Sequence, residues 1–167
     1  MDLLRALNVL REKRPLFHSE ADFQFALAWE IQRLHPRAEI RLEYPSVGGP
    51  NRYVDILVRI DGCAFPIELK YKTKRLSTVI HGEQYDLKNH GAQDLGAYDF
   101  VKDICRVETF ASHLPVFQSG NVLWLTNEPY YWTPPRSQDV GYTDFSVHNG
   151  AVKHGTMRWR SHLAKAQ

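Results

Sequence analysis

The chain has few cysteines, and their scarcity excludes two classes of protein. Only Cys63 and Cys105 occur among 167 residues, and they form no Cys-x-x-Cys pair, so neither a disulfide framework nor a thiolate zinc site is expected. Charges interrupt the apolar residues of positions 1–11, which argues against a signal peptide or a membrane span there. The net charge of +2 is too small to identify a partner. We therefore expect a cytoplasmic protein with no membrane partner.

Several familiar catalytic motifs are also missing. The eight histidines form neither a His-x3-His nor a His-Glu-x-x-His pattern, which would indicate a zinc enzyme. No Gly-x-Ser-x-Gly supports a hydrolase triad, and no Gly-x4-Gly-Lys supports a nucleotide-binding P-loop. The chemistry of this chain must be sought elsewhere.

What the sequence does contain is the composition and patterning of one globular domain. Hydrophobic residues make up 43% and charged residues 24%. Helices are predicted over residues 2–13, 20–34 and 92–112. Strands are predicted over residues 38–45, 52–60, 63–71 and 121–126, and a C-terminal hairpin over 143–159 around Asn149-Gly150. Residues 71–91 show no clear periodicity, which is typical of a functional or mobile loop.

This order predicts an α/β (α+β) fold with a single mixed β-sheet flanked by helices. We expect a single domain over residues 1–167. Its α-β-β-β-α-β core covers about residues 19–127, and residues 128–167 form a C-terminal loop and hairpin.

One tight hairpin brings two carboxylates together. Asp61-Gly62 suits a type I′ turn, which fixes the register so that Asp55 falls opposite Glu68. Side-chain alternation then gives one apolar face and one face that presents Asp55, Glu68 and Lys70. Opposed like charges are destabilising, so a cation site is one explanation for the pair. The alternative is an exposed strand face with an ordinary salt bridge between Lys70 and Glu68.

A carboxylate pair beside a lysine has a specific chemical use. Asp55 and Glu68 can hold Mg²⁺, or Mn²⁺ in its place, with the backbone carbonyl of Leu69 as a further ligand. Such an ion lowers the pKa of a bound water and neutralises charge on a phosphate. Lys70 can orient or deprotonate that water, or steady the phosphoryl oxygens.

The pattern Asp55-x12-Glu68-x-Lys70, on adjacent strands between two helices, resembles the PD-(D/E)XK nuclease superfamily over about residues 19–127. The resemblance implies a restriction-endonuclease-like fold, DNA as the partner and Mg²⁺-dependent hydrolysis of phosphodiester bonds. Glu20 matches the acidic residue that many members carry on the first helix, which implies a metal-binding or catalytic role. The alternative for Glu20 is a helix-N-terminal acid stabilised by the helix dipole. Val54 stands where the family name has proline.

The second long helix supplies weaker candidates. Gln93 lies at its start, where anions bind readily, and is the last predicted catalytic residue. It is one residue too far from Tyr98 for the Gln-x-x-x-Tyr pair of RecB-like members. Lys102 and Arg106 fit ordinary i,i+3 pairs. Two function classes stay open, a nuclease and a non-catalytic nucleic-acid-binding or assembly module on the same fold, and a homodimer is left open.

Overall fold

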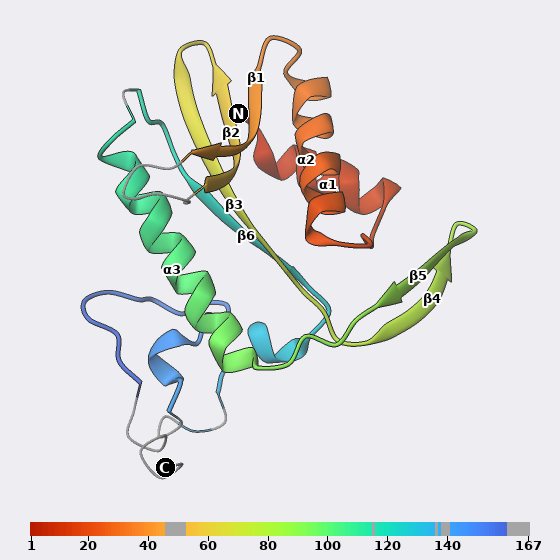
Figure 1. Ribbon diagram of the computed structural model, residues 1–167, viewed down its shortest axis with the longest axis vertical. Coiled ribbons are helices and arrows are strands. Elements are labelled where there is room, and N and C mark those ends of the chain that lie inside the picture. The colour runs from red at the N-terminus through yellow and green to blue at the C-terminus, as the bar shows by residue number, and fades with distance from the viewer. Residues whose placement is uncertain (46–52, 115, 136, 138–140, 160–167) are drawn as a thin grey trace.

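The computed structural model describes residues 1–45, 53–114, 116–135, 137 and 141–159, and Arg52, the first residue of the strand predicted over 52–60, lies outside them. The described chain forms a four-stranded sheet with helices packed against it and a separate two-stranded hairpin (Figure 1). The helices are α1 (Leu3–Lys13), α2 (Glu20–Leu34) and α3 (Gln93–Ala111), with 3₁₀ turns η1 (Pro129–Tyr131) and η2 (Thr143–Phe145). The strands are β1 (Glu39–Pro45), β2 (Tyr53–Ile60), β3 (Cys63–Lys72), β4 (Leu76–Ile80), β5 (Glu83–Leu87) and β6 (Asn121–Thr126). The predicted mixed α/β class is confirmed.

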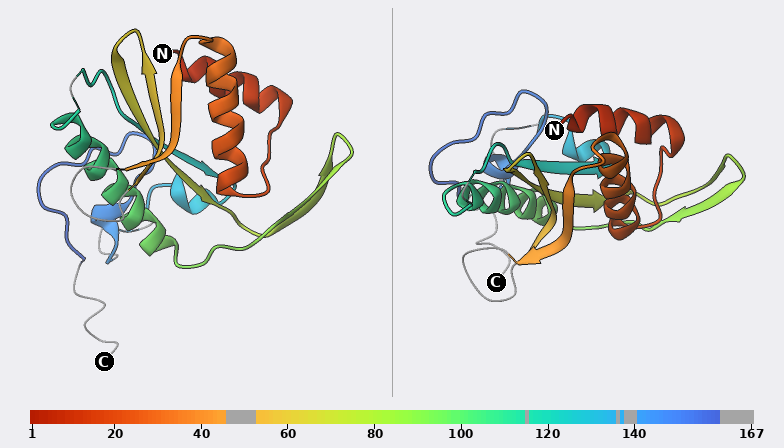
Figure 2. Two further views of the ribbon diagram at one scale, coloured as in Figure 1. Left: turned by 45° about the horizontal axis from the view of Figure 1, so that its top comes forward. Right: turned by 90° about the horizontal axis from the view of Figure 1, so that it is seen from above.

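The main sheet has the order β1-β2-β3-β6. The first three strands are antiparallel, and β6 pairs with β3 in parallel after the chain has crossed over through α3. Parallel neighbours require such a crossover, and a helix is its usual form. β3 is therefore a central strand, and the chain leaves its carboxyl end toward the β4–β5 hairpin and then α3 (Figures 1 and 2).

Both faces of the sheet are covered. Ile56 and Val58 pack with α1 and α2 in the largest apolar cluster, whereas Leu57, between them in sequence, packs with Phe110 of α3. Alternation along a strand sends successive side chains to opposite faces, so α3 covers the face opposite to α1 and α2. The face that carries Glu68 and Lys70 is thus enclosed, where an exposed face was one alternative.

The hairpin that joins β2 and β3 has the predicted register. Ile60 pairs with Cys63 and Val58 with Phe65. Asp61 and Gly62 have φ values of +49° and +81°, both positive as a type I′ turn requires. The regular pairing ends at Ile56 and Ile67, one step before Asp55 and Glu68.

Residues 71–91 are not the loop that the sequence predicts. β3 extends to Lys72, and β4 and β5 form an antiparallel hairpin, here called the arm, around a second turn of positive φ at His81 and Gly82. The arm projects from the body of the molecule (Figure 1). In the described part of the chain its strands pair only with each other, and they bury only Tyr85 and Leu87, so apolar residues are few. That is why periodicity failed to identify them.

The predicted C-terminal hairpin is wrong. The turn at Asn149-Gly150 exists, with Gly150 at φ +81°, but residues 141–159 contain the 3₁₀ turn η2 and no strand. Phe145 and Trp159 instead pack on each other and on Tyr98 of α3. Burial of these aromatic rings against a helix replaces strand pairing. In the described part of the chain, none of the helices combines the length and the apolar character needed to cross a bilayer.

Candidate active site

The three residues of the predicted motif lie together beneath α3. Asp55 is near the start of β2, and its Oδ2 accepts a hydrogen bond from the backbone N–H of Leu69 at 2.5 Å. Glu68 and Lys70 follow on the same face of β3. Glu68 is only 1% exposed, and the Lys70 side chain is 20% exposed. The motif is therefore enclosed in the protein and is no surface salt bridge.

Two residues of α3 complete the cluster. Arg106 Nη1 donates to Oε1 of Glu68 at 2.9 Å, and its Nη2 lies 3.0 Å from Oδ1 of Asp103. The other oxygen of Asp103, Oδ2, lies 2.7 Å from the Lys70 ammonium. Asp103 is 2% exposed, so this carboxylate is a buried counterion shared by two cations. The chain Glu68–Arg106–Asp103–Lys70 fixes the motif to the helix.

The two carboxylates of the motif are harder to ionise than usual. Burial raises the pKa of Glu68 to about 8, and the charge of Asp55 adds to this against the opposing effect of Arg106. Burial also raises the pKa of Asp55, with contributions from the carboxylates of Glu20 and Glu43. The N–H of Leu69 and the charge of Lys70 lower the pKa of Asp55 in part. The cluster thus carries more negative charge than its cations balance.

Lys70 is held in its charged form. Burial lowers its pKa, but the ion pair with Asp103 and the charges of Glu20 and Asp55 outweigh burial and raise the pKa above its ordinary value. An ammonium donates hydrogen bonds and accepts none. The geometry therefore favours Lys70 as a positive group that orients water or phosphate, and disfavours it as a proton acceptor.

Glu20 belongs to the same cluster through α2. Ser19 caps this helix, its hydroxyl accepting the N–H of Asp22 at 3.1 Å, and this starts the helix at Glu20. Oε2 of Glu20 then accepts the backbone N–H of Tyr71 at 2.7 Å. Tyr71 directly follows Lys70, so Glu20 borders the motif at the carboxyl end of β3.

Two residues outside the predicted motif, Gln24 and Glu43, lie beside Asp55. The Gln24 amide nitrogen donates to Oε1 of Glu43 at 2.8 Å and to the backbone carbonyl of Asp55 at 2.7 Å. Gln24 is only 7% exposed, so this buried amide holds the backbone of Asp55 in place. Glu43, on β1, lies close enough to raise the pKa of Asp55. A polar Gln in the buried stripe of α2 was the available signal.

Asp103 and Arg106 also had a signal in the sequence. The spacing Asp103-x-x-Arg106 fits an ordinary surface pair, and the sequence was read in that way. However, Asp103 falls on the helical stripe that buries Gly96, Val107 and Phe110. A carboxylate in a buried stripe requires a cation, which pointed to a partner on the sheet.

Gln93 is not brought into the cluster. It is the first residue of α3, ten residues before Asp103, which corresponds to about 15 Å along a helix axis. No hydrogen bond or ion pair among the described residues joins Gln93 to Asp55, Glu68 or Lys70. Tyr98 packs on aromatic rings and does not reach the motif.

The available donor atoms are oxygens, which are the ligands that a hard divalent cation prefers. In the described part of the chain, hydrogen bonds and ion pairs engage only Oδ2 of Asp55 and Oε1 of Glu68, which leaves the second oxygen of each for a ligand role. The carbonyl of Leu69, the residue after Glu68, is a further oxygen donor, and it also accepts a hydrogen bond of 3.4 Å from the Lys70 ammonium. No group of three His, Cys, Asp or Glu side chains suited to a metal occurs among the described residues, so a full set of side-chain ligands is lacking. The fit rests on the two carboxylates, the carbonyl and the uncompensated negative charge.

Comparison with known proteins adds no family. The chain matches no family model, no curated protein and no solved structure. The inference of function therefore rests on the residues of the site and on their geometry.

Proposed function

We propose that the protein is a Mg²⁺-dependent nuclease that hydrolyses phosphodiester bonds of DNA. The observation that carries the proposal is the buried pair of Asp55 and Glu68, with the pKa of Glu68 raised to about 8, beside a charged Lys70. A fold maintains such a pair at a cost in stability unless a cation or a reaction uses it. The proposal includes the expected cytoplasmic location.

Each residue has a defined part in this chemistry. Asp55, Glu68 and the Leu69 carbonyl would hold the ion, which lowers the pKa of a bound water and neutralises charge on the phosphate. Lys70 donates hydrogen bonds to the attacking water or to a phosphoryl oxygen, and Asp103 keeps it charged and in place. Glu20, at the border of the site, orients the end of β3 through the Tyr71 amide.

DNA is favoured as the substrate by the charges that follow the motif. Lys74 and Arg75 are exposed where the chain passes from β3 into the arm. Asn127, just after β6, holds this junction by two hydrogen bonds to the backbone of Lys74, at 2.7 and 3.1 Å. Fixed cations beside a hydrolytic site attract the phosphate backbone, and their contribution falls as salt rises.

A non-catalytic DNA-binding module is the second candidate, because one observation favours it. Arg106 already neutralises Glu68, and Asp103 already pairs with Lys70, so the cluster is held together by its own ion pairs. A buried network of this kind can serve a structural role alone.

Single-turnover cleavage separates the two candidates. Labelled single-stranded, duplex and branched DNA would be incubated with excess enzyme at saturating Mg²⁺ or Mn²⁺, and metal binding would be measured in parallel by calorimetry. Lys70→Met keeps the aliphatic stem and removes the charge, so cleavage should fall by roughly 10²–10³-fold while metal still binds. Lys102→Met is the matched control, because Lys102 is an exposed residue of α3 that pairs with Asp99. This variant should cleave DNA as the wild type does.

Two results would overturn the nuclease proposal. The first is wild-type protein that binds DNA tightly but cleaves none of the substrates, which would support the non-catalytic module. The second is cleavage that survives both Lys70→Met and Glu68→Gln, because the activity would then come from elsewhere. Thermal melts of each variant show whether a loss of cleavage is a loss of fold.

A further inference from the structure

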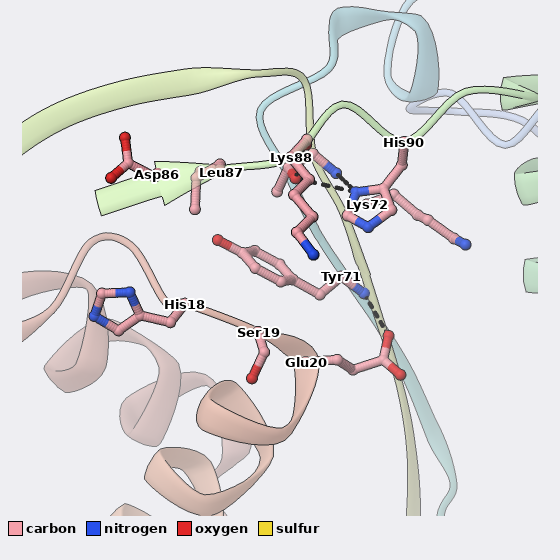
Figure 3. A pocket seen from close by; sticks show the side chains of 10 residues that line it. His18, Ser19, Glu20, Tyr71, Lys72, Asp86, Leu87, Lys88 and His90 are labelled. Carbon is pink, nitrogen blue, oxygen red and sulfur yellow. Dashed lines mark hydrogen bonds between the residues drawn. The ribbon is translucent and has the colours of Figure 1, made fainter. Parts of the chain in front are cut away.

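A pocket of about 390 Å³ adjoins the carboxylate cluster, between the start of α2 and the base of the arm (Figure 3). Its wall begins at Tyr71, the residue after Lys70, whose amide is hydrogen-bonded to Glu20. Glu20 therefore lines the pocket and also borders the cluster. A ligand in the pocket would lie one residue along β3 from the motif.

Two unpaired cations line this pocket. Lys72 ends β3 and Lys88 follows β5, and no hydrogen bond or ion pair engages either ammonium among the described residues. The carboxylates of the lining are already engaged: Glu20 takes the Tyr71 amide, and Asp86 takes the hydroxyl of Ser77 at 2.7 Å. A hydrogen bond from an N–H or a hydroxyl leaves a carboxylate charged, so the lining holds two carboxylates with hydrogen-bond donors and two ammoniums that have no partner among the described residues.

Histidine 90 adds a hydrogen-bond donor of defined orientation. Its Nδ1 accepts the backbone N–H of Thr73 at 2.9 Å, so the neutral ring carries its proton on Nε2. Its own backbone N–H donates to the Thr73 carbonyl at 2.7 Å, and the buried Thr73 hydroxyl donates to the carbonyl of Lys88 at 2.7 Å. These bonds fix the base of the arm, so the His90 ring and the backbone of Lys88 are held in position before any ligand arrives.

The size of the pocket limits what it can accept. Its volume is in the range of about 300–1,000 Å³ that is usual for small-molecule sites. A duplex keeps its bases stacked inside and offers only its outer backbone, whereas an unpaired strand can place a single nucleotide in a pocket. The walls of the pocket come from the start of α2 and from the arm, and contacts of His18 join the two. The His18 ring stacks on that of Tyr85 with the ring centroids 4.7 Å apart, and its Nε2 lies 2.8 Å from Oε1 of Glu83.

We propose that this pocket binds the phosphate of an unpaired nucleotide in the DNA strand that is cut, adjacent to the scissile bond. Lys72 and Lys88 supply the charge, and His90 supplies a directed N–H. The identity of the ligand as DNA rests on the proposed nuclease function, whereas the pocket and its charges do not.

Binding measured without cleavage tests the proposal. Fluorescein-labelled oligothymidylate would be titrated by anisotropy in EDTA at several salt concentrations, against wild type, Lys88→Gln and the double variant Lys72→Gln/Lys88→Gln. Each phosphate contact to a single strand contributes about 0.7 to the slope of the logarithm of affinity against the logarithm of salt concentration. At 0.1 M salt this corresponds to about fivefold in affinity. Lys88→Gln should therefore weaken binding about fivefold and lower the slope by about 0.7, and the double variant should show roughly twice both logarithmic changes.

Arg37→Gln is the matched control. It also removes one positive charge, from a side chain that is 88% exposed and pairs with Asp61. Arg37 lies beyond the far end of α2, a helix of 15 residues and so about 22 Å long, more than two Debye lengths of about 10 Å at 0.1 M salt. Its affinity and slope should equal those of the wild type. A duplex of the same sequence should bind more weakly than the single strand and should be less affected by the lysine changes.

The outcomes separate this inference from the proposed function. Pocket variants with wild-type affinity and slope overturn the pocket, even if the enzyme cleaves DNA. A loss shared equally by Arg37→Gln overturns it as well, because the effect is then one of net charge. A pocket-dependent loss of binding in a protein that never cleaves supports the pocket and overturns the nuclease.

Discussion

Glu68→Gln should make the protein more stable at neutral pH when no metal is bound. The side chain keeps its shape, and its carbonyl oxygen can still accept the Arg106 hydrogen bond of 2.9 Å. What disappears is the cost of folding with a proton on a carboxyl that burial and Asp55 make hard to ionise and that the unfolded chain ionises freely. That cost depends on pH, which gives the prediction its signature.

The sign and size follow from linkage. The folded-state pKa of Glu68 is raised from 4.5 to about 8, so between these values the folded protein holds a proton that the unfolded chain has lost. Its stabilising contribution is complete below pH 4.5 and is lost as the pH rises toward 8. At about 1.4 kcal/mol per pH unit, the wild type should lose roughly 4 kcal/mol of unfolding free energy between pH 5 and 8 relative to Glu68→Gln. Because Glu68 is 1% exposed, solvent screens little of this.

Urea unfolding at several pH values, in EDTA, measures the difference. Glu30→Gln is a control with the opposite shift, because its ion pair with Arg33 lowers the pKa of this equally buried carboxyl. Its contribution is present above pH 4.5 and is lost only in acid, so Glu30→Gln should be destabilised by a constant amount from pH 5 to 8. A constant difference between wild type and Glu68→Gln over that range would refute the assigned cause of strain.

Two other substitutions test the same cluster. Asp55→Asn removes the charge that repels Glu68, so thermal melts in EDTA should show unchanged or higher stability. Mg²⁺ should no longer raise the melting temperature of this variant. A large loss of stability in EDTA would mean that Asp55 has a structural role. Asp103→Ala leaves two partly buried cations without their shared counterion, so urea unfolding should show a loss of about 3 kcal/mol, and a loss below 1 kcal/mol would contradict the shared-counterion role.

The parts of the fold that the sequence predicted are those governed by local rules. Asp61-Gly62 dictates the turn, the turn dictates the register, and both are present in the structure. The helices follow from caps and stripes, as Ser19 illustrates for α2. Burial was harder to predict, because alternation reveals two faces of a strand but does not say that α3 covers the second.

The arm and the C-terminal segment show where local rules fail. Leu76–Ile80 contains β-branched residues, but among the described residues its strand pairs only with β5 and none of its side chains is fully buried, so the sequence carries a weak apolar pattern. In residues 143–159 the pattern predicts strands, yet no sheet edge receives them and the aromatic rings pack on α3 instead. Tertiary contacts decided both cases.

The site was predicted as far as one hairpin could define it. Asp55, Glu68 and Lys70 come from adjacent strands, and their proximity follows from register alone. Asp103 and Arg106 come from a helix 33 or more residues later in the chain, and their contacts depend on how that helix rotates as it packs. The same contacts show that Lys70 is charged, which the sequence had left open.

The charge count of the cluster leads to one more expectation. Among the described residues Asp55, Glu68 and Asp103 face Lys70 and Arg106, and the charges of Glu20 and Glu43 also reach Asp55, so negative charge is left over. Burial and this excess of negative charge both favour a proton on Glu68, and its pKa therefore lies near 8. A divalent cation would remove the same excess, so proton and cation are alternatives at one place.

Binding of Mg²⁺ should therefore release close to one proton per ion near pH 7. Calorimetric titrations in buffers of different ionisation enthalpy measure this number, because the observed heat varies with the buffer in proportion to the protons released. Glu68→Gln has no proton to release, so any residual Mg²⁺ heat in that variant should be independent of the buffer. Binding to the wild type without proton release would place the cation away from Glu68, and the carboxylate pair would then be a structural feature of the α3 interface.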